Sequence, residues 1–266
     1  MSNEMIIIDE NEIDEFSYSS YYAEVMFNEM KLSNATCFFY QYNERNYLVT
    51  NWHVVSGRNS ITGETLNQHG AIPNILKVNL FFQQDVYMDL KSLNIKLYTE
   101  SDEPTWFEWK EGHRYIDVAI IPVITPEEYR IFPINMLGDA YNEDTTPLVR
   151  EDVFILGYPF GVDGGGGLPI WKRGSIASEP SIDIEGLPML YVDTASRSGM
   201  SGSPVIYKER RPITLMDSQK KITSRYRTKF VGVYSGRIGA DDEFKAQLGI
   251  VWKADIIEKM IKENEI

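Results

Sequence analysis

Three residues that lie far apart in the chain carry side chains suited to one hydrolytic reaction. His53 lies in YLVTNWHVVSG, Asp117 begins the apolar run DVAIIPV, and Ser201 lies between two glycines in RSGMSGSPV. A serine whose proton is taken by a histidine attacks a carbonyl carbon, while an aspartate fixes the tautomer of the histidine and stabilises the imidazolium. These residue types therefore predict acyl transfer through a serine nucleophile.

The small residues around Ser201 fit this chemistry. The backbone N–H groups of Gly199 and Ser201 would point into one hole and stabilise the oxyanion that develops on the attacked carbonyl. Removing one such donor typically costs about 3 kcal/mol of transition-state stabilisation. Gly202 would keep the site open to substrate, and Pro204 would begin the next strand.

Each of the three residues also has a plainer interpretation. A histidine beside a tryptophan, as His53 is beside Trp52, is more often a packed structural residue. Asp117 is either a solvated strand cap or a buried carboxylate, and a buried carboxylate needs a donor such as an imidazole N–H because burying it unpaired is too costly. Small residues around Ser201 are also typical of a tight turn.

The elements that would position these residues are mostly strands. Short apolar runs and period-two patterns dominate the chain, and helical periodicity is almost absent. We expect an all-β fold of two six-stranded units in tandem, barrels or sandwiches, joined around 126–150. The expected strands cover 23–30, 35–41, 46–51, 77–83, 95–100 and 117–123, and then 152–159, 170–178, 189–194, 204–208, 229–236 and 248–253.

The C-terminal segment differs from the rest. Four apolar residues fall on one face at helical spacing and predict an amphipathic helix that packs on the second unit: Ile256, Ile257, Met260 and Ile261. The basic stretch KITSRYRTK at 221–229 is interpreted as an exposed loop leading into a strand. The predicted boundaries are an N-terminal extension (1–21), a first unit (22–135), a second unit (136–252) and the helix (253–266).

Composition limits the partners and the compartment. A net charge of −13 repels polyphosphate, so nucleic-acid binding is not expected. The longest apolar run, 118–124, is too short for a membrane span, and MIII near the start is too short for a signal peptide. The single cysteine, Cys37, allows no intrachain disulfide and favours a reducing compartment, so a cytoplasmic protein is expected.

No metal or cofactor is expected. The three histidines, His53, His69 and His113, lie far from one another and from the lone cysteine, so the spacing of a metal site is missing. The glycine run DGGGG at 163–167 lacks the lysine of a phosphate-binding loop. We interpret that run as a mobile connection between strands.

The segments TNWHVV, DVAIIPV and GMSGSPV resemble the three active-site segments of trypsin-like serine proteases of the chymotrypsin fold, in that family's chain order. ILGYPFG, RGSIAS and VDTASRSGMSGSP are similar to the bacterial high-temperature-requirement branch, and FVGVYSG to the strand that borders the substrate. The resemblance covers roughly residues 22–262. It implies two six-stranded antiparallel β-barrels with a C-terminal helix, and a serine endopeptidase that cleaves protein or peptide without a cofactor.

The same resemblance implies a substrate pocket. Its floor would fall near Ala195, and its walls near Tyr234, Ser235 and Arg237. No acid stands at the floor, so a preference for Lys or Arg at the cleaved position is not expected. Tyr234 would narrow the pocket, and Arg237 would attract an acidic residue.

Two departures from the family pattern are informative. Met200 stands where many digestive relatives have an aspartate that pairs with a freed N-terminus, so activation by N-terminal trimming is not expected. Ser203 replaces the more usual second glycine, as in the staphylococcal glutamyl-endopeptidase branch. That branch has a histidine where this chain has Tyr234, so its glutamate specificity is not carried over.

Two functions of different kinds remain open. The first is an active cytoplasmic serine endopeptidase, and the second is a latent protease-like domain that acts as a protein-binding sensor or scaffold. The complete set of His53, Asp117 and Ser201 favours the first. An uncontrolled protease would be toxic in the cytoplasm, so we expect control by a protein partner or by ordering of the loops at 162–167 and 194–200. A role in a bacterial defence module is an analogy from domain type and localisation.

Overall fold

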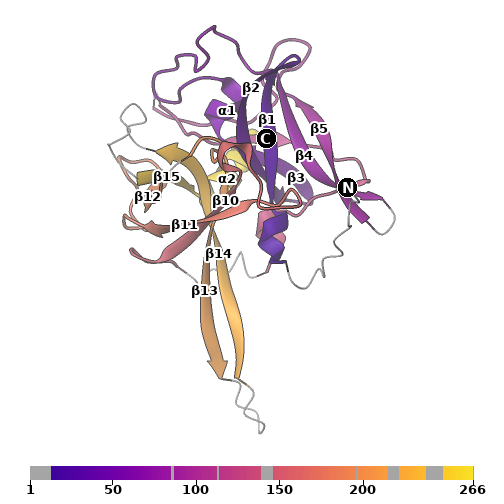
Figure 1. Ribbon diagram of the computed structural model, residues 1–266. Helices are drawn as coiled ribbons and strands as arrows, with labels where there is room; N and C mark the ends of the chain where they lie inside the picture. The colour runs from indigo at the N-terminus through magenta and orange to yellow at the C-terminus, as the bar shows by residue number, and fades with distance from the viewer. Residues whose placement is uncertain are drawn as a thin grey trace.

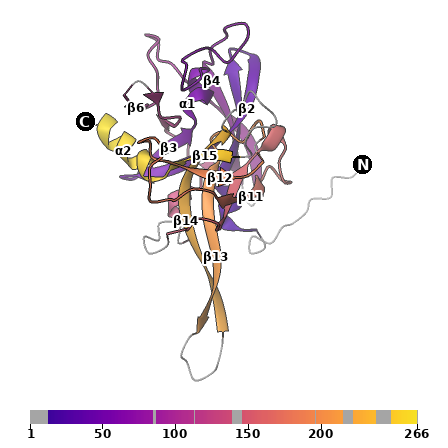
Figure 2. The same ribbon diagram turned by 90° about the vertical axis from the view of Figure 1, so that its left-hand side faces the viewer.

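The computed structural model describes residues 13–84, 87–112, 114–138, 146–195, 197–214, 222–237 and 248–265. Two β-sheet units lie against each other, and a two-stranded arm extends away from the second of them (Figures 1 and 2). Within the described residues, no helix is long and apolar enough to cross a membrane.

The first unit is an antiparallel sheet of seven strands. Its main path runs in the order β5-β4-β1-β2-β3-β8, and a short strand, β9, pairs with β4. The strands are β1 (Ser20–Phe27), β2 (Met30–Tyr42), β3 (Arg45–Thr50), β4 (Ile75–Gln84), β5 (Tyr87–Lys96), β8 (Ala119–Pro122) and β9 (Tyr129–Arg130). Smaller elements are η2 (Glu15–Tyr18), α1 (Trp52–Ser56), β6 (Lys110–Glu111), β7 (Arg114–Tyr115) and η3 (Ile134–Met136).

The second unit is a closed barrel in the order β10-β11-β12-β15-β14-β13. Its elements are β10 (Asp152–Gly157), η4 (Pro159–Gly161), β11 (Ile170–Ile176), β12 (Met189–Asp193), β13 (Pro204–Thr214), β14 (Ile222–Arg237) and β15 (Leu248–Lys253). The predicted all-β fold with a C-terminal helix is confirmed. The main sheet of the first unit has one strand more than the six expected, and the β6-β7 pair adds two further strands, because strands of two residues such as these and β9 are too short to show a period.

The C-terminal helix α2 (Asp255–Asn264) packs against both units, and not on the second alone as the sequence suggested. Its buried residues share one apolar cluster with Phe38 and Ile120 of the first unit and with Ile206 and Trp252 of the second. The Tyr40 hydroxyl of β2 also donates a 2.8 Å hydrogen bond to the Glu258 carboxylate. Helical spacing shows which face of a helix is apolar, but not which surfaces cover it.

Two expected element boundaries were wrong. The basic stretch 221–229 was expected as a loop, but β14 already begins at Ile222 and pairs with a β13 that extends to Thr214. The strand expected at 95–100 is instead β5, which ends at Lys96. The stretch 221–229 is rich in polar residues and lacks the alternation of apolar and polar positions that signals a half-buried strand, whereas at 95–97 this alternation continues past the end of β5.

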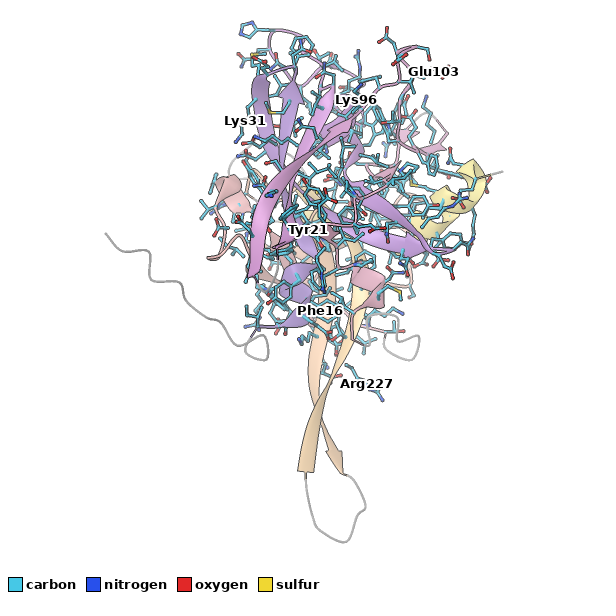
Figure 3. The ribbon with its side chains drawn as sticks, turned by 90° about the vertical axis from the view of Figure 1, so that its right-hand side faces the viewer. Phe16, Tyr21, Lys31, Lys96, Glu103 and Arg227 are labelled. Atoms are coloured by element: carbon cyan, nitrogen blue, oxygen red, sulfur yellow. The ribbon has the colours of Figure 1, made fainter. Side chains whose placement is uncertain are left out.

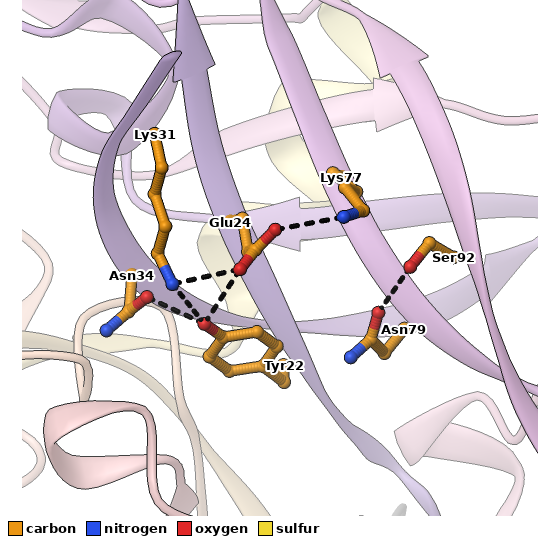
Figure 4. A network of polar contacts seen from close by, with 7 residues as sticks. All are labelled: Tyr22, Glu24, Lys31, Asn34, Lys77, Asn79 and Ser92. Carbon is orange, nitrogen blue, oxygen red and sulfur yellow. Dashed lines mark hydrogen bonds and ion pairs between the residues drawn. The ribbon is translucent and has the colours of Figure 1, made fainter. Parts of the chain in front are cut away.

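A polar network covers part of the outer face of the first sheet (Figure 4). The Glu24 carboxylate accepts hydrogen bonds from Lys31 at 2.9 Å and Lys77 at 3.1 Å, and the bond from Lys31 is the main reason that its pKa is lowered. The Tyr22 hydroxyl donates to the side-chain oxygen of Asn34 at 2.7 Å. The network thereby holds Asn34, which lines the cleft described next.

Candidate active site

Strand pairing places His53 beside Asp117. β3 and β8 are antiparallel neighbours, with Thr50 opposite Ala119. The chain leaves β3 and turns into the short helix α1, which carries His53 on its first turn, while Asp117 stands two residues before β8. Because the end of one strand meets the start of the other, residues 64 positions apart come into contact.

Asp117 is a buried carboxylate with several hydrogen-bond donors. Only 4% of the residue is exposed, which excludes the alternative of a solvated strand cap. Its Oδ2 lies 2.7 Å from Nδ1 of His53, and its Oδ1 accepts the backbone N–H of His53 at 2.8 Å. The Ser235 hydroxyl also donates to Oδ2, and the Asn51 side-chain amide donates to the Asp117 carbonyl at 2.7 Å.

The electrostatics of the pair favour the charged carboxylate. Burial alone would raise the pKa of Asp117, but the His53 charge and the hydrogen bonds from His53 and Ser235 outweigh burial and lower it. Burial alone would lower the pKa of His53, but the Asp117 charge and hydrogen bond raise it above its ordinary value. In neutral His53, Nδ1 must carry the proton that faces the carboxylate, so Nε2 is left with a free lone pair.

Ser201 shares a cleft with His53. The cleft has a volume of about 280 Å³, and the nucleophile segment contributes Ser198, Gly199 and Ser201 to its lining. Ser203 is fully buried, so it does not face this space. The opposite wall comes from the first unit and includes Val25, Leu32, Asn34, Val54, Leu66 and Pro73. The cleft therefore lies between the two units, with a hydroxyl from one and an imidazole from the other.

The peptide groups around Ser201 leave two N–H groups available. The Ser198 carbonyl accepts the Phe160 N–H at 2.7 Å, and the Met200 carbonyl accepts the Ser203 N–H at 3.1 Å. The N–H of a trans peptide points opposite to its carbonyl, so the N–H groups of Gly199 and Ser201 point away from these partners. Neither N–H donates a hydrogen bond to another residue in the described part of the chain.

Backbone crowding explains the glycines of this segment. Gly199 has φ +91°, and a Cβ there would lie 2.3 Å from the Tyr158 carbonyl oxygen. Gly202 has φ +82°, and its Cβ would lie 2.1 Å from the Thr36 carbonyl oxygen. L-residues with side chains rarely adopt such φ values, and neither position has room for a methyl group.

Thr36 of β2 anchors the nucleophile segment from the other unit. Its N–H donates to the Ser201 carbonyl at 2.9 Å, and its hydroxyl donates to the Gly199 carbonyl at 2.8 Å. The same hydroxyl accepts the Tyr158 N–H at 3.2 Å. Sequence reasoning did not single out Thr36, because a threonine in a strand carries no local sign of a contact 163 residues away.

Thr36→Val should reduce both stability and activity. The variant keeps the shape of the side chain but leaves the Gly199 carbonyl and the Tyr158 N–H without this partner, and each buried unsatisfied group costs about 1–3 kcal/mol. We expect the free energy of unfolding to fall by about 2 kcal/mol and hydrolytic kcat to fall at least tenfold. Ser20→Ala is the matched control, because its hydroxyl also joins the units, to the Leu156 carbonyl at 2.8 Å, but does not touch the segment. Equal loss of kcat in both variants at equal loss of stability would contradict an anchoring role.

The four residues expected to form a substrate pocket lie in different surroundings. Tyr234 is buried in the core of the second barrel, where its ring lies against Gly249. Ser235 contacts Asp117, a role that the sequence did not suggest. Ala195 is half-buried, and the side chain of Arg237 lies outside the described residues. The cleft described above is lined by none of these four, so the pocket stays a prediction.

The sequence matches the trypsin-like peptidase domain family over residues 35–213, a range that contains His53, Asp117 and Ser201. The chain therefore belongs to the trypsin-like peptidases and is a serine endopeptidase by family. No curated protein matches the sequence.

Two solved structures are similar to this chain. One is an inactive mutant form of Rv3671c from M. tuberculosis, with a TM-score of 0.48 and 18% identity over 93% of this chain and 86% of that one. The other is the serine endoprotease from Yersinia pestis, with a TM-score of 0.51 and 13% identity over 93% of this chain. This chain spans 62% of the length of the Yersinia protein. At 13% identity the likeness to the Yersinia structure concerns the fold alone.

Proposed function

We propose that this protein hydrolyses peptide bonds with Ser201 as nucleophile, His53 as general base and acid, and Asp117 as the group that orients His53. The observation that carries the proposal is the 2.7 Å contact between Asp117 and Nδ1 of a histidine whose ring lines the same cleft as Ser201. This contact and the shared cleft support the sequence of nucleophile, base and orienting carboxylate that acyl transfer requires.

The proposed reaction has two halves. The Ser201 hydroxyl attacks the peptide carbonyl while Nε2 of His53 takes its proton, and the oxyanion of the tetrahedral intermediate accepts hydrogen bonds from the N–H groups of Gly199 and Ser201. His53 then gives the proton to the leaving amine, and the acyl group remains on Ser201. Water, deprotonated by His53, attacks this ester, the bond between the acyl carbon and Oγ of Ser201 breaks, and His53 returns the proton to Ser201 as the acid leaves. These side chains move every proton and electron pair, so the proposal uses no cofactor.

A fluorophosphonate probe tests the proposal. The probe phosphonylates only a serine that is activated by a base, so a formed site predicts stoichiometric labelling of the purified protein, mapped to Ser201 by peptide mass spectrometry. Labelling should be prevented by prior acylation with a serine-protease inhibitor. If the protein stays unlabelled, with or without candidate partners present, the site is latent and the alternative of a binding sensor or scaffold is preferred.

The proposal extends to setting and control. We propose that the peptidase works in a reducing, cytoplasmic setting and is activated by a regulatory protein partner. A role in a bacterial defence module rests only on the analogy of domain type and localisation given above. The single cysteine, Cys37, is buried and needs no oxidising compartment. The acidic composition supports the proposal that neither nucleic acid nor a membrane is its partner.

The proposed base predicts a pH profile. Since only neutral His53 accepts the serine proton, kcat/KM should rise with pH, with a midpoint above the ordinary imidazole value of about 6.5. Asp117 causes this upward shift by stabilising the imidazolium, so the midpoint should move down in Asp117→Asn. Initial rates on a fluorogenic peptide, measured across the titration, give both midpoints. A midpoint that stays the same in the two proteins would contradict the pairing of His53 with Asp117 in solution.

A further inference from the structure

The two-stranded arm extends beyond the barrel, and within the described part of the chain no other strand pairs with its outer length. β13 pairs with β10 only from Val205 to Tyr207, and β14 pairs with β15 only from Gly232 onward. Beyond these points the described strands pair with each other alone, as far as Thr214 opposite Ile222. Figures 1 and 2 show the resulting ribbon leaving the barrel.

The edges of such an arm are able to pair with a further strand. An isolated two-stranded ribbon is marginally stable in water, and unpaired strand edges invite another strand. The β13 edge is blunted by Pro212, which has no N–H to donate. The β14 edge from Ile222 to Phe230 has no proline or glycine and is rich in threonine, tyrosine and isoleucine, which favour strands.

The arm is basic, whereas the rest of the chain is acidic. Residues 208–214 and 222–229 contain six Lys or Arg residues and one acidic residue, a net charge of +5. Since the whole chain has a net charge of −13, the remainder carries −18. Arg211 stands directly opposite Arg225 in the ladder, and like charges at such positions destabilise a strand pair. Figure 3 shows the Arg227 side chain extending away from the arm.

We propose that the arm is a docking site for an acidic polypeptide segment, which adds to the open edge of β14 as a further strand. Main-chain hydrogen bonds would provide affinity, and carboxylates of the partner would neutralise the arginines. Among acidic partners, a polypeptide fits better than duplex DNA. DNA offers no strand edge, and its stiff, uniformly charged backbone would extend past the arm toward a body that carries −18.

Both strands of the arm lead directly into the proposed site. β13 begins at Pro204, three residues after Ser201, and β14, near its end at Arg237, carries Ser235, whose hydroxyl donates to Asp117. The Gly202 N–H donates to the Tyr234 carbonyl at 2.9 Å, and the Tyr234 N–H donates to the Ser203 carbonyl at 2.9 Å. A segment bound to the arm would therefore pair with the strand that carries Ser235, and that strand is hydrogen-bonded to the nucleophile segment. This part of the inference rests on the proposed function.

The test is binding of a synthetic peptide in which glutamate alternates with valine and threonine. The peptide is labelled with fluorescein and titrated, by anisotropy at physiological ionic strength, with the full chain carrying Ser201→Ala, so that cleavage does not interfere. Saturable binding is expected. Arg211→Gln with Arg225→Gln should weaken it about tenfold, since two positive partners of the peptide carboxylates are removed. Lys91→Gln with Lys96→Gln, two exposed residues of β5, is the charge-matched control and should bind like the parent.

Four outcomes overturn the proposal: absence of peptide binding, equal weakening by the control variant, tighter binding of a duplex DNA of equal charge, and arm-dependent self-association in sedimentation, which would assign the arm to a second copy. Circular dichroism and thermal unfolding show whether each variant is folded. Fluorophosphonate labelling of the protein with an intact Ser201 is measured separately. A failure of docking with labelling intact rejects the arm proposal alone, and a failure of labelling with docking intact rejects the catalytic proposal alone.

Discussion

Ser201→Ala should lower kcat for peptide hydrolysis by about 10⁶-fold and abolish fluorophosphonate labelling, because no acyl-enzyme can form without the hydroxyl. Substrate affinity should change little, since the methyl side chain of alanine still fits between Gly199 and Gly202. The measurements are steady-state kinetics on a fluorogenic peptide and titration of active sites with the probe.

Ser203→Ala is the matched control for this variant. It makes the same chemical change two positions away, on a hydroxyl that is fully buried and makes no hydrogen bond to any described residue. Removing an unsatisfied buried hydroxyl costs no hydrogen bond, so activity and labelling should be retained and the free energy of unfolding should not fall. Retained activity in Ser201→Ala, or loss of activity in Ser203→Ala alone, would move the nucleophile away from Ser201.

Asp117→Asn should lower kcat by about 10⁴-fold while the protein stays folded. The carboxylate accepts a hydrogen bond from Nδ1 of His53, whereas an amide in its place also presents donor N–H groups. The variant therefore favours the tautomer with the proton on Nε2, which cannot accept the proton of Ser201. Kinetics of the variant near neutral pH measure the loss directly.

Two comparisons separate this role from a structural one. Asp152→Asn removes an exposed carboxylate that pairs with Arg173 at 2.5 Å, and it should leave kcat unchanged. The double variant of Ser201 and Asp117 should be no slower than Ser201→Ala alone, because residues that act as one unit are not additive. An additive double variant, or an Asp117→Asn protein with normal kcat, would show that Asp117 does not act through His53.

Much of the fold was predictable because its determinants are local. Most strands reveal themselves through apolar runs and turn residues, and the amphipathic pattern of Ile256 to Ile261 predicts the final helix. The outer parts of the arm strands, beyond the expected 204–208 and 229–236, were missed for the same reason. A stretch such as 222–229 lacks the alternation of apolar and polar residues in the sequence that marks a strand.

The candidate site was predictable only in part. The residue types and their neighbours indicated His53, Asp117 and Ser201. His53 follows an apolar strand, Asp117 precedes one, and Ser201 has glycines close to it on both sides. The sequence left open whether Asp117 was buried, and burial at 4% exposure with three donors to its carboxylate answers that question. The sequence resemblance also assigned Ser235 to a pocket wall, whereas in the structure the Ser235 hydroxyl donates a hydrogen bond to Asp117.

By itself, then, the amino-acid sequence determined the strand-rich class, the terminal helix and the chemical identity of the proposed catalytic groups. These follow from short-range patterns of side-chain polarity and backbone freedom. Only the tertiary structure decided that Thr36 holds the segment of Ser201 from the opposite unit, and that a basic ribbon leads into the site. Such contacts depend on which strand ends meet when the sheets pair, and residues more than a hundred positions apart leave no mark of that meeting in their own neighbourhoods.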